Sequence, residues 1–260
     1  PTSSRRQRQM CIRDSIFPNY RSINYPKSAK NSIVVGAIDS WTNRVAAYSA
    51  WGPTLDGRIK PDVVAGGHWQ GGSLCDQHGP YFSYCTSGTD ENPGKTFIVP
   101  MVFPNTPALY GHLSQTSAAA AAASGALARI LDGMRMHDPD ADPLPSTLRA
   151  FLIHSARPLP LEQFAGPNYR TGYGIVTTDT ALIQLNHAGS YREGVLGDDQ
   201  LDSYEFTLTE ATLSSGQSLK ITLAWDDVPA VPGAVRTLVN DLDVFVIDPN
   251  GVKHHPWTLD

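Results

Sequence analysis

A short apolar run near the start of the chain predicts a buried strand. Residues 32–38 read SIVVGAI, and the polar residues Asp39, Ser40 and Asn43 close the run. A β-branched apolar stretch of this length is typical of a short buried strand. In residues 46–67, Gly-Pro, Asp-Gly and Gly-Gly pairs separate short apolar pieces, so we expect loop and strand rather than helix.

Two later segments have the pattern of helices. Six consecutive alanines follow Ser117, and alanine is the best helix former, so we predict a helix from about 117 to 136. A second helix is predicted over residues 146–155, where Pro145 precedes the segment and apolar residues recur at helical spacing. Residues 68–108 are rich in Gly, Pro, Ser and aromatic residues, which indicates a long surface insertion that contains a little strand.

The hydrophobic pattern changes to a period of two in the last part of the chain. Residues 203–209, 218–225 and 242–247 alternate apolar with polar or small residues, which predicts strands. The sequence DPNG at 248–251 is a strong turn signal. We therefore expect an antiparallel β-sandwich domain over residues 190–260, incomplete because three or four strands cannot close a sandwich. Its apolar face is expected to hold Leu219, Ile221, Leu223 and Trp225.

The composition is typical of a globular protein and argues against two classes of partner. The chain has 260 residues, 41% hydrophobic and 17% charged, with a formal net charge of -5. No apolar run reaches the length of about 18 residues that spans a membrane, and the start shows no signal peptide. The sequence has no basic stripe interleaved with aromatic residues, which is the pattern that would indicate nucleic-acid binding. We therefore expect no membrane and no nucleic-acid partner, while the oligomeric state is open.

The first 15 residues differ from the rest. Residues 1–15 are polar, rich in arginine and without periodicity, and their string MCIRDS resembles translated sequencing-adaptor sequence. We expect a disordered or artefactual leader there.

Three cysteines leave two interpretations open. Cys75 and Cys85 flank a short loop rich in Gly, Tyr and Ser, while Cys11 lies apart. A disulfide could join Cys75 to Cys85 if the loop doubles back, and two free thiols are the alternative.

Ser117 is a candidate nucleophile because of its place at the start of a predicted helix. The free backbone N–H groups of a first helical turn, and the positive end of the helix dipole, stabilise an oxyanion that develops beside them. Serine is also a preferred N-cap residue, so plain capping is the alternative. The residue alone does not separate the two interpretations.

The order of several sequence blocks resembles the subtilase family of serine proteases. Residues 32–67 resemble a VGA strand, a polar turn, an F-S-S-x-G-P type segment with Tyr48 at its first position, and a K-P-D-V-x-A-P-G segment. Residues 115–125, QTSAAAAAASG, resemble the nucleophile motif G-T-S-M-A-x-P-x-x-x-G, with Ser117 at the position of the nucleophile. The segment GYGIVTTDTAL at 172–182 also matches. SLKITLAWDD and LVNDLDVFVIDPNG resemble the jelly-roll domain that follows the catalytic domain in one branch of alkaline subtilases.

This resemblance implies a fold class and an activity. Residues 16–189 are expected to be the C-terminal part of an α/β subtilisin-like catalytic domain, followed by the truncated β-sandwich. The implied activity is a serine endopeptidase acting on protein or peptide substrates, secreted or extracellular, with Ser117 as the catalytic residue and no cofactor required for chemistry. A noncatalytic relative that serves as a binding or structural module is the alternative.

The residues that complete the family's triad are not recognisable in this sequence. The aspartate, the H-G-T-H-V-A-G histidine and the asparagine of the oxyanion hole precede these blocks in the family, and none of the eight histidines lies in such a motif. Serine is a poor nucleophile without a base. The chain by itself is therefore expected to be catalytically silent.

Three positions depart from the family pattern. Gln115 replaces the glycine before Thr-Ser, Ala121 replaces the proline four residues after Ser117, and Gly66 stands where the family has proline. A glycine at the first position lets the backbone pass close to a substrate or take unusual angles, so Gln115 could crowd the site. Alanine favours the helix, so the change at 121 is expected to matter less.

Asn240, Asp241 and Asp243 are weak calcium candidates. They place two carboxylates and an amide close together beside a predicted strand, and calcium takes such oxygen ligands. Related alkaline subtilases often bind calcium, which would act here as a structural ion. The alternative is a turn with exposed acidic residues.

Overall fold

The fold is taken from a computed structural model of the chain. The described residues are 20–68, 114–160, 167–187, 189–207 and 219–257, together with the backbone of the short strands at 9–11, 70–73, 99–100 and 110–113.

A small, mainly parallel sheet forms the centre of the molecule. Strand β2 (Ile33–Asp39) lies between β1 (Gln9–Cys11) and β4 (Val63–His68), and pairs in parallel with both. Strand β3 (Arg44–Val45) returns from the end of β2 and pairs with it in antiparallel fashion. The strand predicted at 32–38 is confirmed. Strand β1 falls within residues 1–15, where a disordered or artefactual leader is expected; the other residues of that segment lie outside the described ranges.

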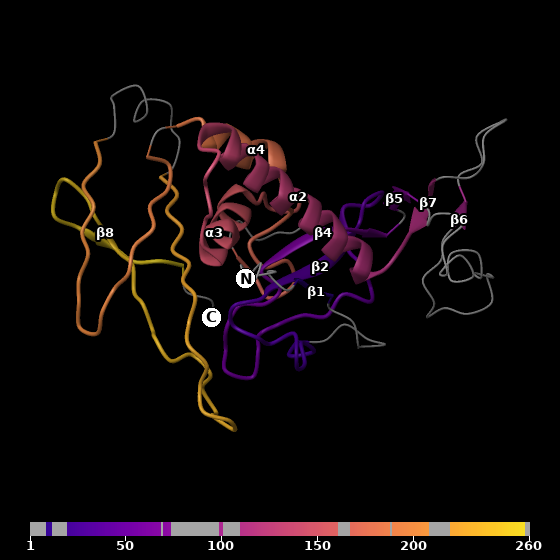
Figure 1. The fold of residues 1–260 in the computed structure, drawn as a ribbon. Coiled ribbons are helices and arrows are strands. Elements are labelled where there is room, and N and C mark those ends of the chain that lie inside the picture. Colours follow the sequence, from indigo (N-terminus) through magenta and orange to yellow (C-terminus); the bar gives the residue numbers. More distant parts are fainter. Residues whose placement is uncertain are drawn as a thin grey trace, which may run out of the picture.

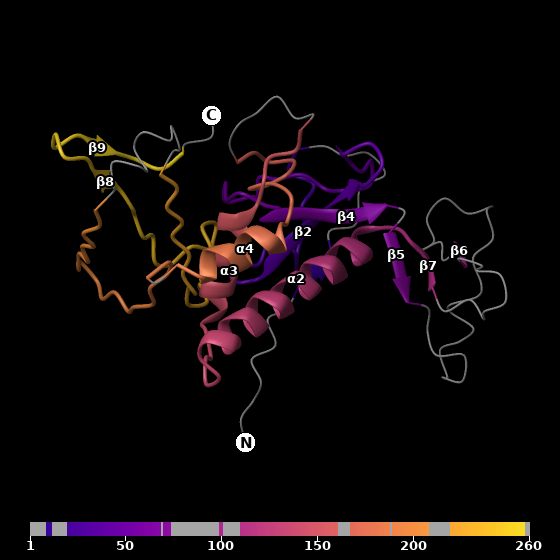
Figure 2. The same ribbon diagram turned by 90° about the horizontal axis from the view of Figure 1, so that it is seen from above.

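Three helices cover one face of this sheet. Helix α2 (Thr116–His137) packs on β2 and β4, and helices α3 (Pro145–Ser155) and α4 (Thr178–Leu185) pack beside it, as Figures 1 and 2 show. Both helices predicted from the sequence are confirmed within a residue or two. They form because alanine-rich and amphipathic stretches can bury one face against the sheet.

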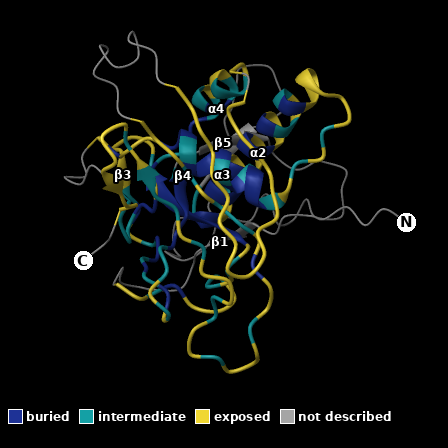
Figure 3. Cartoon of the chain, turned by 90° about the vertical axis from the view of Figure 1, so that its left-hand side faces the viewer, coloured by how far each residue is buried: buried dark blue, intermediate teal, exposed yellow. Residues whose placement is uncertain are grey.

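Both faces of β2 are buried, which explains its unbroken apolar sequence. Ile33, Val35 and Ala37 join the core under the helices. Val34 and Ile38 point to the opposite face, where they pack in two smaller apolar clusters with neighbouring loops. Figure 3 shows this buried centre in dark blue.

A buried ion pair fixes the segment that leads into β4. Lys60 and Asp62 are 3% and 6% exposed, and the Lys60 Nζ lies 2.6 Å from Asp62 Oδ2. The same carboxylate oxygen accepts the backbone N–H of Val34 at 2.7 Å, and Lys60 Nζ donates to the Ser32 carbonyl at 2.8 Å. Burial lowers the pKa of Lys60, while the charge of Asp62 opposes that shift. Leaving one member of such a buried pair without the other costs about 3–5 kcal/mol, so Asp62 serves the fold.

A second sheet lies beside the start of α2. It consists of β5 (Gln70–Ser73), β7 (Tyr110–Leu113) and β6 (Val99–Pro100), all antiparallel, and β7 leads into the helix. Its strands β5 and β6 fall within the insertion that the sequence predicts over 68–108. Cys75 and Cys85 lie outside the described residues, so both interpretations of these cysteines stay open.

The structure does not confirm the β-sandwich predicted for residues 190–260. Across the part of this segment that the structure describes, the paired strands are β8 (Val246–Ile247) and β9 (Lys253–His254). They join through the turn predicted at 248–251, where Asp248 Oδ1 accepts the N–H groups of Asn250 and Val252, both at 2.9 Å. The segments predicted as strands at 203–209 and 218–225 run without strand pairing over their described residues.

The alternation at 219–225 nevertheless separates two faces. Leu219, Ile221 and Leu223 are exposed by 41–49%. The alternate residues face α3: Lys220 donates to the His154 carbonyl, and Thr222 Oγ1 lies 2.9 Å from His154 Nδ1. Leu219, Ile221 and Leu223 therefore point away from the α/β body, because the polar side of the segment makes the contact. Trp225, the fourth residue of the predicted apolar face, is partly buried and donates its Nε1–H to the Asn240 carbonyl at 3.0 Å.

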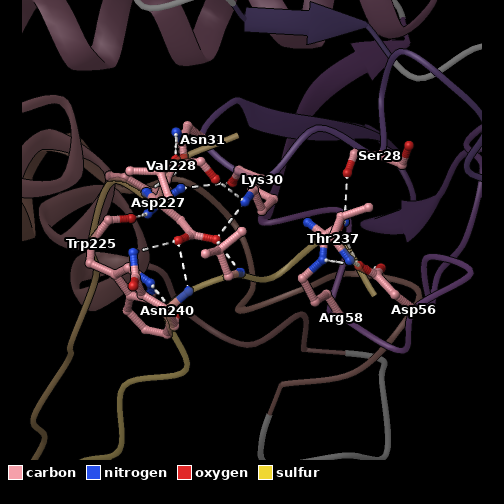
Figure 4. Close-up of polar contacts among 12 residues, drawn as sticks. Ser28, Lys30, Asn31, Asp56, Arg58, Trp225, Asp227, Val228, Thr237 and Asn240 are labelled. Carbon is pink, nitrogen blue, oxygen red and sulfur yellow. Dashed lines mark hydrogen bonds and ion pairs between the residues drawn. The ribbon is translucent and has the colours of Figure 1, made fainter. Parts of the chain in front are cut away.

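Asp227 anchors the C-terminal segment to the body of the molecule. Its carboxylate accepts Lys30 Nζ at 2.5 Å, the Val239 N–H at 2.8 Å, and both the backbone N–H and the amide of Asn240 at 2.9 Å. Its own N–H and carbonyl bond the side-chain amide of Asn31 at 3.0 and 2.8 Å (Figure 4). Burial acts to raise the pKa of Asp227, but hydrogen bonds from Lys30 and the two backbone groups outweigh it and hold the value at about 2.

A second polar cluster also joins the C-terminal segment to the body of the molecule. Arg58 Nε forms an ion pair with Asp56 Oδ2 at 3.0 Å, and Arg58 Nη2 donates to Ser28 O at 2.8 Å and to Thr237 Oγ1 at 3.0 Å. The Thr237 hydroxyl in turn donates to Asp56. Burial acts to raise the pKa of Asp56, yet the hydrogen bonds from Arg58 and Thr237 lower it well below its usual range.

Acidic side chains from the same segment also complete the start of α3. The N-cap residue Leu144 has no side-chain cap to offer. Asp226 Oδ2 accepts the Ser146 N–H at 3.1 Å, and Glu193 Oε1 accepts the Leu144 N–H at 2.9 Å. Carboxylates are favoured at a helix N-terminus because they satisfy its free N–H groups and its dipole.

We predict that Asp227→Asn lowers the free energy of unfolding by about 2–4 kcal/mol at pH 7, because buried donors lose a charged acceptor. The pKa of about 2 lies below the ordinary 3.8, so the stabilisation is complete above about pH 4 and is lost as the pH falls toward 2. Urea unfolding at pH 7 and pH 2.5 measures both effects.

The matched control is Asp132→Asn, since Asp132 pairs with Arg129 on the exposed surface of α2 at 2.7 Å. It should change the unfolding free energy by about 0.5 kcal/mol or less. Equal losses in the two variants would contradict the anchoring role of Asp227.

Candidate active site around Ser117

Ser117 occupies the exposed start of α2. It is the second residue of the helix, after the buried Thr116, and its own side chain is exposed. Its hydroxyl forms no hydrogen bond with another described residue. The N-cap position is Gln115, which has no side-chain cap bond. The alternative interpretation, in which Ser117 caps the helix, therefore does not hold.

Gln115 has a backbone conformation that belongs to glycine. Its φ and ψ are 95° and 171°, a region that residues with a side chain enter only at a cost of about 1–3 kcal/mol. The subtilase nucleophile motif has glycine here. Glycine takes such angles without a side-chain penalty, whereas this chain adopts them with glutamine.

Hydrogen bonds hold the Gln115 peptide on both sides. Its N–H donates to the Gly67 carbonyl at 2.6 Å, at the end of β4. Its carbonyl accepts the N–H groups of Ala118 and Ala119 at 3.1 and 3.4 Å, which starts the helix. The Tyr48 hydroxyl donates to the same Gly67 carbonyl and lies 3.2 Å from the Gln115 nitrogen. The strand, the tyrosine and the helix therefore meet at one residue, Gln115.

Close packing of small residues brings β4 and α2 together at this point. A Cβ placed on Gly67 would lie 2.6 Å from the Ala37 Cβ, 3.0 Å from the Gln115 carbonyl oxygen and 3.2 Å from the Ala119 Cβ. These distances leave no room for a side chain. Glycine at 67 and alanine at 37 and 119 thus allow the helix start to approach the sheet.

The other departures from the family pattern have little effect on this geometry. Ala121 is exposed on α2, so the methyl group that replaces a proline faces solvent. Gly66 pairs with Ile38 in the sheet. Only the change at 115 touches the turn before Ser117.

Within the described ranges, no histidine forms a hydrogen bond with Ser117. His154 bonds Thr222, and burial lowers its pKa. The ring of His68 lies 6.2 Å from the Tyr48 ring, centroid to centroid. The side chains of His78 and His112 lie outside the described residues. Among the described residues, Ser117 therefore has no hydrogen-bonded histidine that could act as its base.

The calcium candidates lie at the Asp227 anchor. The Asn240 amide nitrogen donates to Asp227 Oδ1, while Asp241 and Asp243 are exposed. Among the side chains that the structure describes, no group of three or more His, Cys, Asp or Glu could hold a metal ion.

Comparison with known proteins assigns the family. Residues 12–174, more than half of the chain, match the Subtilase family. The chain therefore belongs to the subtilases, a family of serine proteases. No helix within the described residues is both long enough and apolar enough to cross a membrane.

Individual relatives are distant and much longer. The chain is 27% identical over 256 residues to the Dictyostelium discoideum serine protease/ABC transporter B family protein tagD, covering 78% of this chain and 13% of that protein. It is 25% identical over 304 residues to tagB of the same organism, covering 92% of this chain and 15% of that protein. The chain thus spans less than a sixth of the length of these relatives.

Solved subtilisin-like proteases are similar over part of the chain. The Clostridium perfringens CspB protease matches with a TM-score of 0.48 and 23% identity, over 65% of this chain and 30% of that chain. Fervidolysin from Fervidobacterium pennivorans matches with a TM-score of 0.42 and 25% identity, over 62% of this chain and 20% of that chain.

We predict that Gly67→Ala lowers the free energy of unfolding by about 1–3 kcal/mol, because its methyl group overlaps Ala37 and the Gln115 carbonyl. Chemical denaturation followed by tryptophan fluorescence measures the change.

Gly125→Ala serves as the control, since a Cβ there meets nothing within 4 Å. It should stabilise the chain by about 0.5–1 kcal/mol through helix propensity. A destabilisation of the same size at both positions would show that the junction of β4 and α2 is not tightly packed.

Proposed function

We propose that the chain carries the nucleophile of a serine endopeptidase, with Ser117 as the catalytic residue. The observation that supports this most is the presentation of Ser117: an exposed hydroxyl in the first turn of α2, directly after a residue with glycine-type backbone angles. Membership of the subtilases supports the same reaction class.

The geometry fits nucleophilic attack on a peptide carbonyl. The serine oxygen would attack the carbonyl carbon, and the negative charge that develops on the carbonyl oxygen would be stabilised by N–H groups near the helix start. A histidine would take the serine proton and return it to the leaving amine, and an aspartate would orient that histidine. Protein or peptide chains are the proposed substrates.

The base and its partner would come from sequence outside these 260 residues. None of the eight histidines stands in the family's histidine motif. The chain alone would therefore not cleave peptide bonds, since an unassisted serine hydroxyl is a weak nucleophile.

A noncatalytic relative that acts as a binding or structural module is the second candidate. The exposed apolar residues Leu219, Ile221 and Leu223 favour it, because they offer a contact surface that the described residues do not cover. The glutamine at 115 favours it as well, since a side chain stands where the family has none.

Further parts of the proposal follow from the resemblance to the branch with a second domain. Residues 190–260 would belong to a jelly-roll β-sandwich. Asn240, Asp241 and Asp243 would be a weak structural calcium site, and no cofactor would take part in the chemistry. The longer protein would act outside the cell, as a secreted or extracellular enzyme.

We predict that the 260-residue chain shows no labelling of Ser117 by a fluorophosphonate and no hydrolysis of casein. A longer gene product that includes intact aspartate and histidine motifs should do both. In that product, Ser117→Ala should lower turnover by several orders of magnitude, because the triad acts as a unit. Mass spectrometry of the labelled peptide and a chromogenic assay measure these outcomes.

Ser124→Ala in the same helix is the control, and it should leave turnover within about twofold. Labelling of the short chain at the rate of the longer product would mean that a histidine within these 260 residues acts as the base. A longer product with intact motifs that is neither labelled nor active would favour the noncatalytic module.

A further inference from the structure

Tyr48 and Gln115 touch each other at the turn before Ser117. The segment that resembles F-S-S-x-G-P has tyrosine at its first position, Tyr48, and the nucleophile motif has glutamine in place of glycine, Gln115. In the structure the Tyr48 oxygen lies 3.2 Å from the Gln115 nitrogen. The same hydroxyl donates to the Gly67 carbonyl, which also receives the Gln115 N–H.

The contact is one that only the tyrosine hydroxyl can make. A phenylalanine at 48 would leave the Gly67 carbonyl with one donor and the Gln115 N–H with one acceptor. A glycine at 115 would take the observed angles, φ 95° and ψ 171°, without a side-chain penalty. Glutamine does not, so its conformation persists only if the surroundings hold it.

Tyr48 is well placed to hold Gln115 in this backbone conformation. The chain around Tyr48 is fixed to β2, since the Ala46 N–H donates to the Ala37 carbonyl at 2.9 Å and the Ser49 hydroxyl accepts the Ala37 N–H at 3.0 Å. The tyrosine ring packs against the main core. Burial raises the pKa of Tyr48, so the phenol keeps its proton and its ability to donate at neutral and mildly alkaline pH.

We infer that Tyr48 is a positioning residue: its hydroxyl fixes the Gln115 peptide in a glycine-type conformation and thereby sets the place of Ser117. This inference rests on the proposed function for the role of Ser117. The inference goes beyond the proposed function, because it states that the glutamine at 115 makes the tyrosine hydroxyl necessary. With glycine at 115, the hydroxyl should become dispensable.

A double-mutant cycle in the 260-residue chain tests this coupling without any need for catalysis. Four proteins are compared: the unaltered chain, Tyr48→Phe, Gln115→Gly and the double variant. Nuclear magnetic resonance gives the hydrogen-exchange rate of the amide at 115 and the chemical shifts of the amides at 116–118. Urea unfolding gives the global stability of each protein separately.

We expect Tyr48→Phe to raise the exchange rate at 115 by about fivefold or more, and to shift the amides of Thr116 and Ser117, when glutamine is present. In the Gln115→Gly background the same substitution should leave the exchange rate within about twofold and the shifts unchanged. Tyr173→Phe is the control, because its hydroxyl forms no hydrogen bond within the described residues; it should alter neither readout. If the Tyr48→Phe chain folds only when glycine stands at 115, that result would show the same coupling.

Equal effects of Tyr48→Phe in both backgrounds would overturn the inference, since the tyrosine would then serve the core in general. So would unchanged amides in the single variant, or a failure of both chains with the Tyr48→Phe substitution to fold. In an active longer product, Tyr48→Phe should lower kcat by about tenfold with KM within twofold, and Gln115→Gly should restore it. If the longer product is inactive, the amide measurements still decide the positioning role.

Discussion

The structure depends most on the junction between the end of β4 and the start of α2. One hydrogen bond of 2.6 Å, from the Gln115 N–H to the Gly67 carbonyl, joins sheet to helix there. The absence of a side chain at Gly67 lets the two approach, and the buried alanines of α2 extend the contact over β2 and β4. The exposed position of Ser117 is a consequence of this junction, because the helix can start only where the Gln115 carbonyl is held.

The C-terminal segment is attached by hydrogen bonds and an ion pair rather than by close apolar packing. Asp227 and Asp226 of this segment accept hydrogen bonds from Lys30 and from the start of α3, and Thr237 donates to Asp56 of the body. These contacts tie the segment to the α/β body. Directional polar contacts of this kind fix an orientation, and in this orientation the apolar residues at 219, 221 and 223 face outward. The segment thus lies on the body through polar contacts, of which Figure 4 shows those at Asp227 and Asp56.

Local sequence patterns predicted the elements of the α/β part well. The apolar run at 32–38, the alanine stretch and the turn at 248–251 carry strong local preferences, and all three are confirmed. The nucleophile position followed from motif order, and the angles of Gln115 agree with the reason given for a glycine there. The contacts of Tyr48 and Asp227 could not be predicted, since they join residues 67 and 197 positions apart in the sequence. Alternation at 203–209 and 218–225 predicted strands, but alternation shows only which residues share a face; strand pairing also requires a neighbour.

The central claim is that Ser117 is a nucleophile presented by a glutamine held in a glycine-type conformation. A crystal structure of the longer product after reaction with a fluorophosphonate tests it most directly. The claim predicts phosphorus bonded to Ser117 Oγ, a phosphoryl oxygen facing the N–H groups at the helix start, and Gln115 with φ near 95°. An adduct on another residue, or a negative φ at Gln115 beside a labelled Ser117, would contradict it.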